Sequence, residues 1–443
     1  MHIRLSDHFD YSRLLRFTLP SVIMMVFTSV YGVVDGLFVS NFVGKTSFAA
    51  LNFIFPFIMV LGTLGFMFGA GGSALVGKTL GEGNSDKANR IFSFILWFSA
   101  VIGIAVGAVG FTAVGTVATL LGAEGSMLGD CILYGRISFI GMPFFMLQME
   151  FQSLFITSEK PKLGLFATVA AGLTNIVLDA LFIAGFGCGL AGAAAATVLG
   201  QTVGGLGPIF YFARQNSSLL RIIHAGFDGP SLLRICVNGS SELMSNISMS
   251  LVGMLYNVQL IRFAGENGVA AYGVLMYVNF VFLAIFIGYS IGTAPLVSYN
   301  YGAKRENELK NLFWRSVSIL VACSLVMFTA AELFARPIAA VFVGFDGELY
   351  DLTLRGFRIF SFSFLLADMA IFGSCFFTAL NDGLTSALIA FLRTVVFQTA
   401  AILLLPIVLG VDGIWISIVV AELMAVLATL FFLKYRNKEF HYL

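Results

Sequence analysis

The sequence predicts an all-α integral membrane protein with twelve transmembrane helices in two six-helix lobes. Of its 443 residues, 58% are hydrophobic and 11% are charged, whereas soluble domains carry about 25% charged residues. Apolar runs long enough to cross a bilayer recur along the whole chain. Residues in the second half also match residues in the first half at one constant offset of 221 positions.

Polar residues divide the apolar sequence into segments whose lengths suit bilayer-spanning helices. A transmembrane β-barrel would instead show strands of about ten residues with alternating hydrophobicity, and the sequence has no such pattern. The expected helices span residues 14–39, 50–77, 91–120, 131–157, 163–186, 190–213, 235–262, 270–298, 312–335, 353–379, 385–409 and 413–433.

The constant offset indicates that the two halves are repeats. At this offset, Gly71 and Gly81 match Gly292 and Gly302. Because six is an even number of helices, both halves begin on the same side of the membrane. The repeat is therefore parallel, with a pseudo-twofold axis along the membrane normal and a binding cavity between the halves. The expected parts are an N-terminal lobe at 1–213, a cytoplasmic linker at 214–234 and a C-terminal lobe at 235–443.

The distribution of Lys and Arg predicts that both termini lie in the cytoplasm. Nineteen of the 25 Lys and Arg residues lie in the termini and in the loops on their side of the membrane, and basic loops are cytoplasmic by the positive-inside rule. The apolar run 14–39 is too long for the core of a signal peptide, so we interpret it as the first span. We expect the lipid bilayer as a partner and no nucleic acid.

Two polar residues interrupt the apolar helix expected at 163–186. Asn175 and Asp179 are four residues apart and therefore share one face of a helix. A carboxylate at membrane depth costs roughly 3 kcal/mol on insertion scales, so it usually faces a water-filled cavity or a partner. We predict that Asp179 binds the coupling ion of a transporter. The alternative is an acid that pairs with a neighbouring helix and serves packing.

A second acid, Asp35, lies toward the outer end of the first expected helix, and Thr28 lies seven residues earlier on the same face. Together with Asp179, Asn175 and Thr197, they can form one hydrated acidic pocket in the first half. Two close acids suit proton exchange, and the same oxygens can coordinate Na⁺, a hard cation. The alternative for Asp35 is an acid at the membrane interface, solvated by water.

Six further polar residues in or near the spans are candidates for substrate contact or for a role in the second half. The two glutamines of the fourth helix share a face, and the glutamate between them points elsewhere. The acid of the seventh helix lies near its cytoplasmic start, where solvation is the alternative. The acid of the tenth helix can contact substrate or pair with the arginine of the eleventh. These residues are Gln148, Glu150, Gln152, Glu242, Asp368 and Arg393.

Other chemistry is not favoured by the sequence. Residues 72–79, GSALVGKT, fit the P-loop pattern, but a nucleotide site needs a preceding strand and a soluble domain. We expect Lys78 to reach the membrane interface and the nearby glycines to form a helix contact. The five Cys are scattered along the chain, and we interpret them as small buried hydrophobic residues. We expect no enzyme activity, because no His, Ser–Lys pair or metal cluster lies at membrane depth, and no metal or cofactor besides the coupling cation.

Over essentially its whole length the chain resembles the multidrug and toxic compound extrusion (MATE) transporters of bacteria. The most specific segments are Asn175–Asp179 (NIVLD) with the following Phe182 and Ile183, the turn at 77–90, Ala270–Gly273 (AAYG), Pro295–Ala303 (PLVSYNYGA) and Gly410–Trp415 (GVDGIW).

The resemblance implies an alternating-access antiporter of the bacterial cytoplasmic (inner) membrane, active as a monomer, that exports lipophilic organic cations, antibiotics among them, against inward H⁺ or Na⁺. Asp35 and Asp179 match the two acids of the family's N-terminal pocket, and Asn175 and Thr197 match polar partners. The chain departs from the family after the fourth helix, where Ile156–Pro161 lacks the usual Arg and Gly.

A lipid-linked saccharide flippase, or an exporter of another small molecule, with the same two-lobe plan is the alternative function. A flippase would need a larger and more cationic central cavity to bind phosphate. The expected spans hold few Arg and Lys, which favours the cation antiporter.

Overall fold

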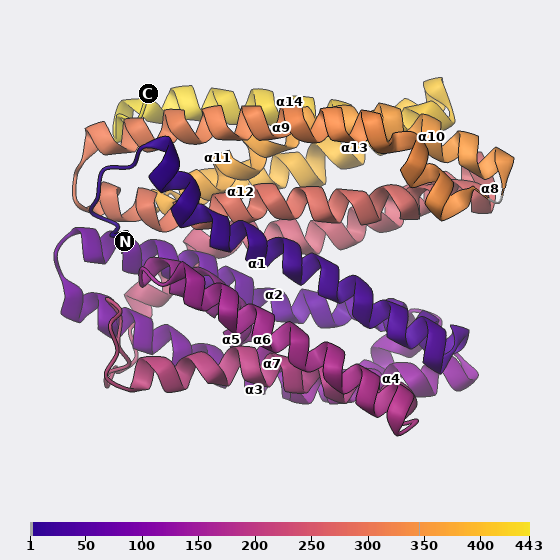
Figure 1. The fold of residues 1–443 in the computed structure, drawn as a ribbon, viewed down its shortest axis with the longest axis horizontal. Helices are drawn as coiled ribbons and strands as arrows, with labels where there is room; N and C mark the ends of the chain where they lie inside the picture. The colour runs from indigo at the N-terminus through magenta and orange to yellow at the C-terminus, as the bar shows by residue number, and fades with distance from the viewer. Residues whose placement is uncertain (1–2, 345) are drawn as a thin grey trace.

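The computed structural model describes residues 3–344 and 346–443, with the exception of the side chains of Val33, Leu37, Ser40 and Lys45. The described chain is helical throughout its spans, and it forms two bundles that lie side by side (Figure 1). The first bundle comes from the N-terminal half and the second from the C-terminal half. Both termini lie at the same end of the molecule, which we call the terminal end.

The N-terminal lobe begins at α1, whose start is fixed by a helix cap. The Asp10 carboxylate accepts a 2.7 Å hydrogen bond from the backbone N–H of Arg13, and this bond holds the pKa of Asp10 below its usual value. The elements of the lobe are α1 (Tyr11–Phe38), the π-helical turn η1 (Val39–Val43), α2 (Lys45–Gly81), α3 (Ser85–Leu120), α4 (Gly125–Ile140), α5 (Met142–Thr157), α6 (Pro161–Asp179), the π-helical turn η2 (Ala180–Gly185) and α7 (Gly189–Ala213).

The C-terminal lobe begins at α8 (Gly229–Gly302), a 74-residue helix that is broken at Gly265, where φ is 60° and ψ is −152°. A residue with a side chain rarely adopts this backbone conformation, so glycine marks the turn between two spans. The remaining elements are α9 (Glu306–Val343), α10 (Gly347–Ser361), the 3₁₀ turn η3 (Phe362–Leu365), α11 (Ala367–Ala379), α12 (Gly383–Phe391), the π-helical turn η4 (Leu392–Phe397), α13 (Gln398–Leu409) and α14 (Val411–Phe440).

The expected number of spans is confirmed once two irregular helices are taken into account. Within the described residues, ten helices are long and apolar enough to cross a membrane. The pair α4 and α5, bent by 58°, forms one more span, and the break of α8 at Gly265 brings the total to twelve. The fold is therefore the all-α, twelve-span membrane protein that the composition predicts.

The segment between the lobes contains less irregular chain than the expected linker, 214–234. Helix α8 already begins at Gly229, because the Asp228 carboxylate accepts a 3.1 Å hydrogen bond from the Ser231 N–H and Pro230 occupies the first turn. An N-cap followed by proline is a strong helix start. The helix therefore starts earlier than the polar composition of this segment had predicted.

The two lobes meet through a pair of glycine contacts that obey the sequence offset. A Cβ atom added to Gly81 of α2 would lie 2.0 Å from the carbonyl oxygen of Tyr299. A Cβ atom added to Gly302 of α8 would lie 2.0 Å from the carbonyl oxygen of Lys78. Adding 221 to the residue numbers of Lys78 and Gly81 in the first lobe gives those of Tyr299 and Gly302 in the second. The two contacts are thus related by the pseudo-twofold repeat.

A second set of contacts follows the same rule nearer the membrane centre. Gly71 of α2 packs on Gly239 of α8, and Gly292 of α8 packs on Thr18 of α1. These close approaches involve the halves of α1, α2 and α8 that lie toward the terminal end. Backbones approach this closely only where side chains are small. The lobes are therefore in tight contact at the terminal end.

The P-loop-like stretch takes part in this helix contact. It lies within α2, where a Cβ atom on Gly77 would lie 2.2 Å from the Ser298 hydroxyl oxygen of the other lobe. The Lys78 ammonium lies over the ring of Tyr301, 5.2 Å from its centroid. A phosphate site of this type is formed by the backbone N–H groups of a loop. Here the residues belong to a regular helix that packs on the other lobe, so the glycines and Lys78 contribute to helix packing.

We predict that Gly239→Ala destabilises the protein and that Gly253→Ala does not. A Cβ atom at 239 would lie 1.9 Å from the backbone oxygen of Met67, whereas one at 253, in the same helix, has nothing within 4 Å. Overpacking of this kind costs about 1–3 kcal/mol, while alanine in place of an open helical glycine gains up to about 1 kcal/mol. Thermal unfolding of the purified variants in detergent tests this. An unfolding temperature of Gly239→Ala equal to that of Gly253→Ala would contradict the close lobe contact.

Candidate functional site

Two acids from different helices come together inside the N-terminal lobe. Asp35 lies near the end of α1 and Asp179 is the last residue of α6, and these two helices pack on each other. The Asp35 carboxyl group lies against the side chains of Asp179 and Asn175. The Asn175 amide also donates a long, 3.5 Å hydrogen bond to the Thr197 hydroxyl oxygen. The structure thus brings together four of the five residues expected in the acidic pocket.

The acids of this pocket lack adequate partners, and the side chain of Asp35 is half-buried. Asp179 is fully buried, and neither of its carboxylate oxygens has a hydrogen-bond partner among the described residues. One carboxylate oxygen of Asp35 and the amide oxygen of Asn175 are likewise without a partner. Two adjacent carboxylates that are both ionised would repel each other, and an uncompensated buried charge is very costly. The arrangement therefore suits the binding of a proton or a small cation between the two acids.

The fifth expected residue, Thr28, is not part of the hydrogen-bonded group. Its hydroxyl donates a 2.9 Å hydrogen bond to the carbonyl oxygen of Met24, one turn earlier in α1. Thr18 does the same toward Leu14. This back-bonding satisfies a hydroxyl within its own helix, and it removes the need for a partner in the pocket.

Two tyrosines border the pocket and were missed in the sequence. Tyr31 lies beside Gln148 and close to Asp35, and Tyr134 of α4 lies beside Thr197 and close to both acids. Tyr31 is four residues before Asp35 and therefore shares its helix face. This spacing is visible in the sequence, so the proximity of Tyr31 was predictable. No spacing in the sequence relates Tyr134 to the pocket acids, because its distance from them depends on how α4 packs.

Each helix that carries a pocket acid changes to π geometry just beyond it. The turn η1 begins four residues after Asp35, and η2 begins directly after Asp179. The two π-helical turns also contact each other. A π turn is rare and occurs mostly at functional sites. It frees backbone groups from regular pairing, so the acids lie beside the most adaptable parts of α1 and α6.

A second group of polar residues lies between the lobes. A cavity of about 30 Å³ is lined by residues of α2, α5, α8 and α11, among them Gln152, Glu242 and Thr378. Pockets that bind drug-sized ligands measure about 300–1,000 Å³, so this cavity is too small for such a ligand. Glu242 thus faces the other lobe rather than open solvent, and it lies opposite Gln152.

Glu150 lies away from both groups. It is fully buried, it faces Ser99 of α3, and neither of its carboxylate oxygens has a hydrogen-bond partner among the described residues. The backbone of Glu150 packs closely on Gly69 of α2. Glu150 therefore points to a different side of α5 from Gln152, as the helical periodicity predicts.

The arginine in the second lobe has a partner that the sequence did not suggest. Arg393 lies in the π-helical turn η4, and its guanidinium donates to both oxygens of Glu422 in α14, at 2.9 and 2.8 Å. Asp368 instead accepts a 2.7 Å hydrogen bond from the N–H of Met369. The pairing of Asp368 with Arg393 considered above is therefore wrong, because η4 packs on α14 and turns Arg393 toward Glu422.

Comparison with known proteins places the chain in a family. The MatE family model matches residues 20–181 and again residues 243–402, one match in each half. The multidrug export protein MepA of Staphylococcus saprophyticus is 25% identical over 94% of this chain and 92% of its own length. The MepA of Staphylococcus haemolyticus is 24% identical over 95% of this chain and 92% of its own length.

Solved structures agree in fold. A crystal structure of MATE in complex with MaL6 has a TM-score of 0.93 at 23% identity and covers 98% of both chains. An outward-facing multidrug resistance MATE family transporter of the MOP superfamily has a TM-score of 0.92 at 23% identity, with 98% of this chain and 97% of that chain covered. A MOP superfamily transporter from Pyrococcus furiosus, described as having a binding pocket of reverse polarity, has a TM-score of 0.91 at 22% identity, with the same coverage.

The matches in both halves cover well over half of the chain, and they agree with the twelve-span, two-lobe fold. The chain is therefore a bacterial-type member of the MatE family, the multidrug and toxic compound extrusion transporters.

Proposed function

We propose that this protein is a secondary active multidrug efflux antiporter, which exports lipophilic organic cations in exchange for H⁺ or Na⁺ by alternating access. The observation that carries the proposal is the adjacent pair of Asp35 and Asp179, in which one oxygen of Asp35 and both oxygens of Asp179 lack hydrogen-bond partners among the described residues. Two ionised carboxylates at this depth are stable only when a positive charge compensates them. A proton or Na⁺ that enters between the acids would meet this need, with Asn175 and Thr197 as further polar neighbours.

The charge of the buried residues supports a cationic substrate. A structural relative is described as having a binding pocket of reverse polarity that suggests a different function, so we argue the substrate's charge from this chain's own residues. In this chain the buried or half-buried polar groups of the spans include Asp179, Glu242 and Asp368, and the cation Arg393 is already paired with Glu422. An acidic interior attracts cations and repels anions, which also disfavours a flippase of phosphate-linked saccharides.

Alternating access follows from the two lobes and their contact. The cavity beside Glu242 is too small for a drug, so the lobes must part before a substrate can reach this acid. The bias of Lys and Arg toward the terminal end supports a cytoplasmic location for both termini, in the cytoplasmic membrane of a bacterium. We infer that the conformation described here is closed toward the cytoplasm, and that the transporter acts as a monomer.

Coupling requires that the ion and the substrate influence each other's affinity. We propose that ion binding at Asp35 and Asp179 changes the geometry of α1 beside the π-helical turn η1, and that α1 passes this change to the lobe contact at Thr18. A substrate bound between the lobes would oppose the change. Reciprocal linkage then makes inward movement of the ion drive outward movement of the substrate.

We predict that Asp179→Asn abolishes ethidium efflux and leaves the protein folded, because asparagine keeps the shape of the side chain but loses the exchangeable charge. Efflux from intact or everted cells under separately imposed proton and sodium gradients measures this. Wild-type efflux that responds to only one gradient names the coupling ion. Glu266→Gln, a change of an exposed acid, is the matched control and should export normally. Normal gradient-driven export by Asp179→Asn would refute the assignment.

We predict that Glu242→Gln weakens the binding of cationic substrates and leaves ion binding at the N-terminal pocket intact. An interaction with a charged group contributes about 1.5–3 kcal/mol, which corresponds to about a ten- to a hundredfold rise in the dissociation constant. Fluorescence titration of purified variants with ethidium measures the change, again with Glu266→Gln as the control. An unchanged dissociation constant for Glu242→Gln would exclude this acid from the substrate site.

A further inference from the structure

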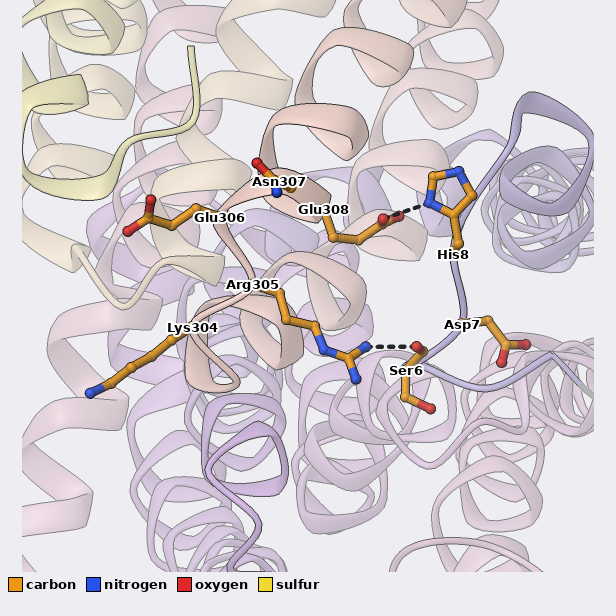
Figure 2. Close-up of a pocket in the computed structure, with 8 residues that line it drawn as sticks. All are labelled: Ser6, Asp7, His8, Lys304, Arg305, Glu306, Asn307 and Glu308. Carbon is orange, nitrogen blue, oxygen red and sulfur yellow. Dashed lines mark hydrogen bonds and ion pairs between the residues drawn. The ribbon is translucent and has the colours of Figure 1, made fainter.

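The first residues that the structure describes form a connection between the lobes. Residues 3–9, which we call the N-terminal strap, precede α1 and cross the terminal end of the molecule. Figure 2 shows the strap residues Ser6, Asp7 and His8 opposite the start of α9, around a pocket of about 510 Å³. The strap contains a turn at residues 5–7, closed by a 3.1 Å hydrogen bond from the N–H of Asp7 to the carbonyl oxygen of Arg4. Side chains of both lobes bond to other backbone groups of the strap.

Most of the strap's polar contacts are with the C-terminal lobe. Arg305 donates a 2.7 Å hydrogen bond to the carbonyl oxygen of Ser6. The Glu308 carboxylate accepts a 3.0 Å hydrogen bond from the N–H of Phe9 and pairs with the His8 ring nitrogen Nδ1 at 2.7 Å (Figure 2). Asn311 donates a 2.8 Å hydrogen bond to the carbonyl oxygen of Phe9. The strap is therefore anchored firmly to α9.

Hydrogen bonds also join the strap to the N-terminal lobe, among them one of 3.1 Å from the Arg13 guanidinium of α1 to the carbonyl oxygen of His8. The backbone N–H of Leu5 donates a 2.6 Å hydrogen bond to the carboxylate of Glu159, which lies in the turn between α5 and α6 and has a φ of 61°. The side chain of Leu5 is fully buried in a cluster that contains Ile156 of the N-terminal lobe and Leu296 of the C-terminal lobe. The strap thus places apolar side chains, Leu5 and Phe9, and the hydrogen bond from Leu5 to Glu159 at the boundary of the lobes.

We propose that the N-terminal strap is a gate that holds the lobes closed at the terminal end, and that Glu159 is its releasable anchor. Separation of the lobes at this end must break the bond between Leu5 and Glu159 and expose the Leu5 side chain. The contacts to Arg305 and Glu308 join the strap to the C-terminal lobe and persist where the strap stays with that lobe. Because a hydrogen bond to a charged group is stronger than a neutral one, Glu159 positions the strap and adds to the barrier for opening.

The experiment measures the separation of the lobes directly. Spin labels on Lys87→Cys, at the start of α3, and on Lys310→Cys, in α9, lie on exposed positions of different lobes, in a background without the five native Cys. Pulsed electron resonance then gives the fraction of molecules with a long distance at the terminal end. It is compared among the unmodified strap, Glu159→Ala and a deletion of residues 3–8. Glu306→Ala, at an exposed position of the same pocket, is the matched control.

We expect Glu159→Ala to raise the ratio of long-distance to short-distance molecules about tenfold or more, the effect of losing one hydrogen bond to a charged group, and the deletion to raise it further. Glu306→Ala should leave it unchanged. A variant that is only less stable would unfold at a lower temperature without gaining the long-distance population. An unchanged distance distribution in both Glu159→Ala and the deletion would overturn the proposal. The measurement involves no transport, so its failure is distinguishable from failure of the antiport proposal.

Discussion

The constraint on which this structure depends is the burial of two neighbouring carboxylates in a membrane protein. Asp35 and Asp179 come from different helices, and both oxygens of Asp179 lack a partner among the described residues. In a medium of low polarity such a pair is stable only with a positive charge nearby. The packing of α1 on α6 and the two π-helical turns that follow the acids are the structural means that bring the carboxylates together. The binding of a small cation between these acids is what we propose on this ground.

Helix α1 connects this site to the contact between the lobes. Asp35 lies near the end of α1, while Thr18, near its start, packs against Gly292 of the other lobe. The contact of Gly81 and Gly302 with the partner backbones repeats the same close packing nearby. Tightly packed backbones respond to a small shift as rigid bodies. A change of charge at the acids can therefore alter the fit of the lobes, which is the coupling that an antiporter needs.

Much of this architecture was predictable from the sequence. Apolar length predicts the spans, and the offset of 221 residues predicts the lobe contacts, because repeat-related glycines occupy equivalent places in the interface. Asn175 and Asp179 were found because a polar pair within an apolar helix is conspicuous. What the sequence did not predict depends on contacts between helices. The approach of Tyr134 to the pocket and the pairing of Arg393 with Glu422 are set by how helices pack, and local periodicity holds no information about that.

The most direct test of the account is to measure which ion leaves the protein when a substrate binds. Purified protein in weakly buffered detergent solution is equilibrated with radioactive Na⁺ and a pH indicator, and tetraphenylphosphonium is then added. The account predicts that wild type releases about one H⁺ or Na⁺ per bound substrate, as reciprocal linkage requires, and that the double variant Asp35→Asn, Asp179→Asn releases neither. Release of the same amount by both proteins, or substrate binding to wild type without release of either ion, would contradict it.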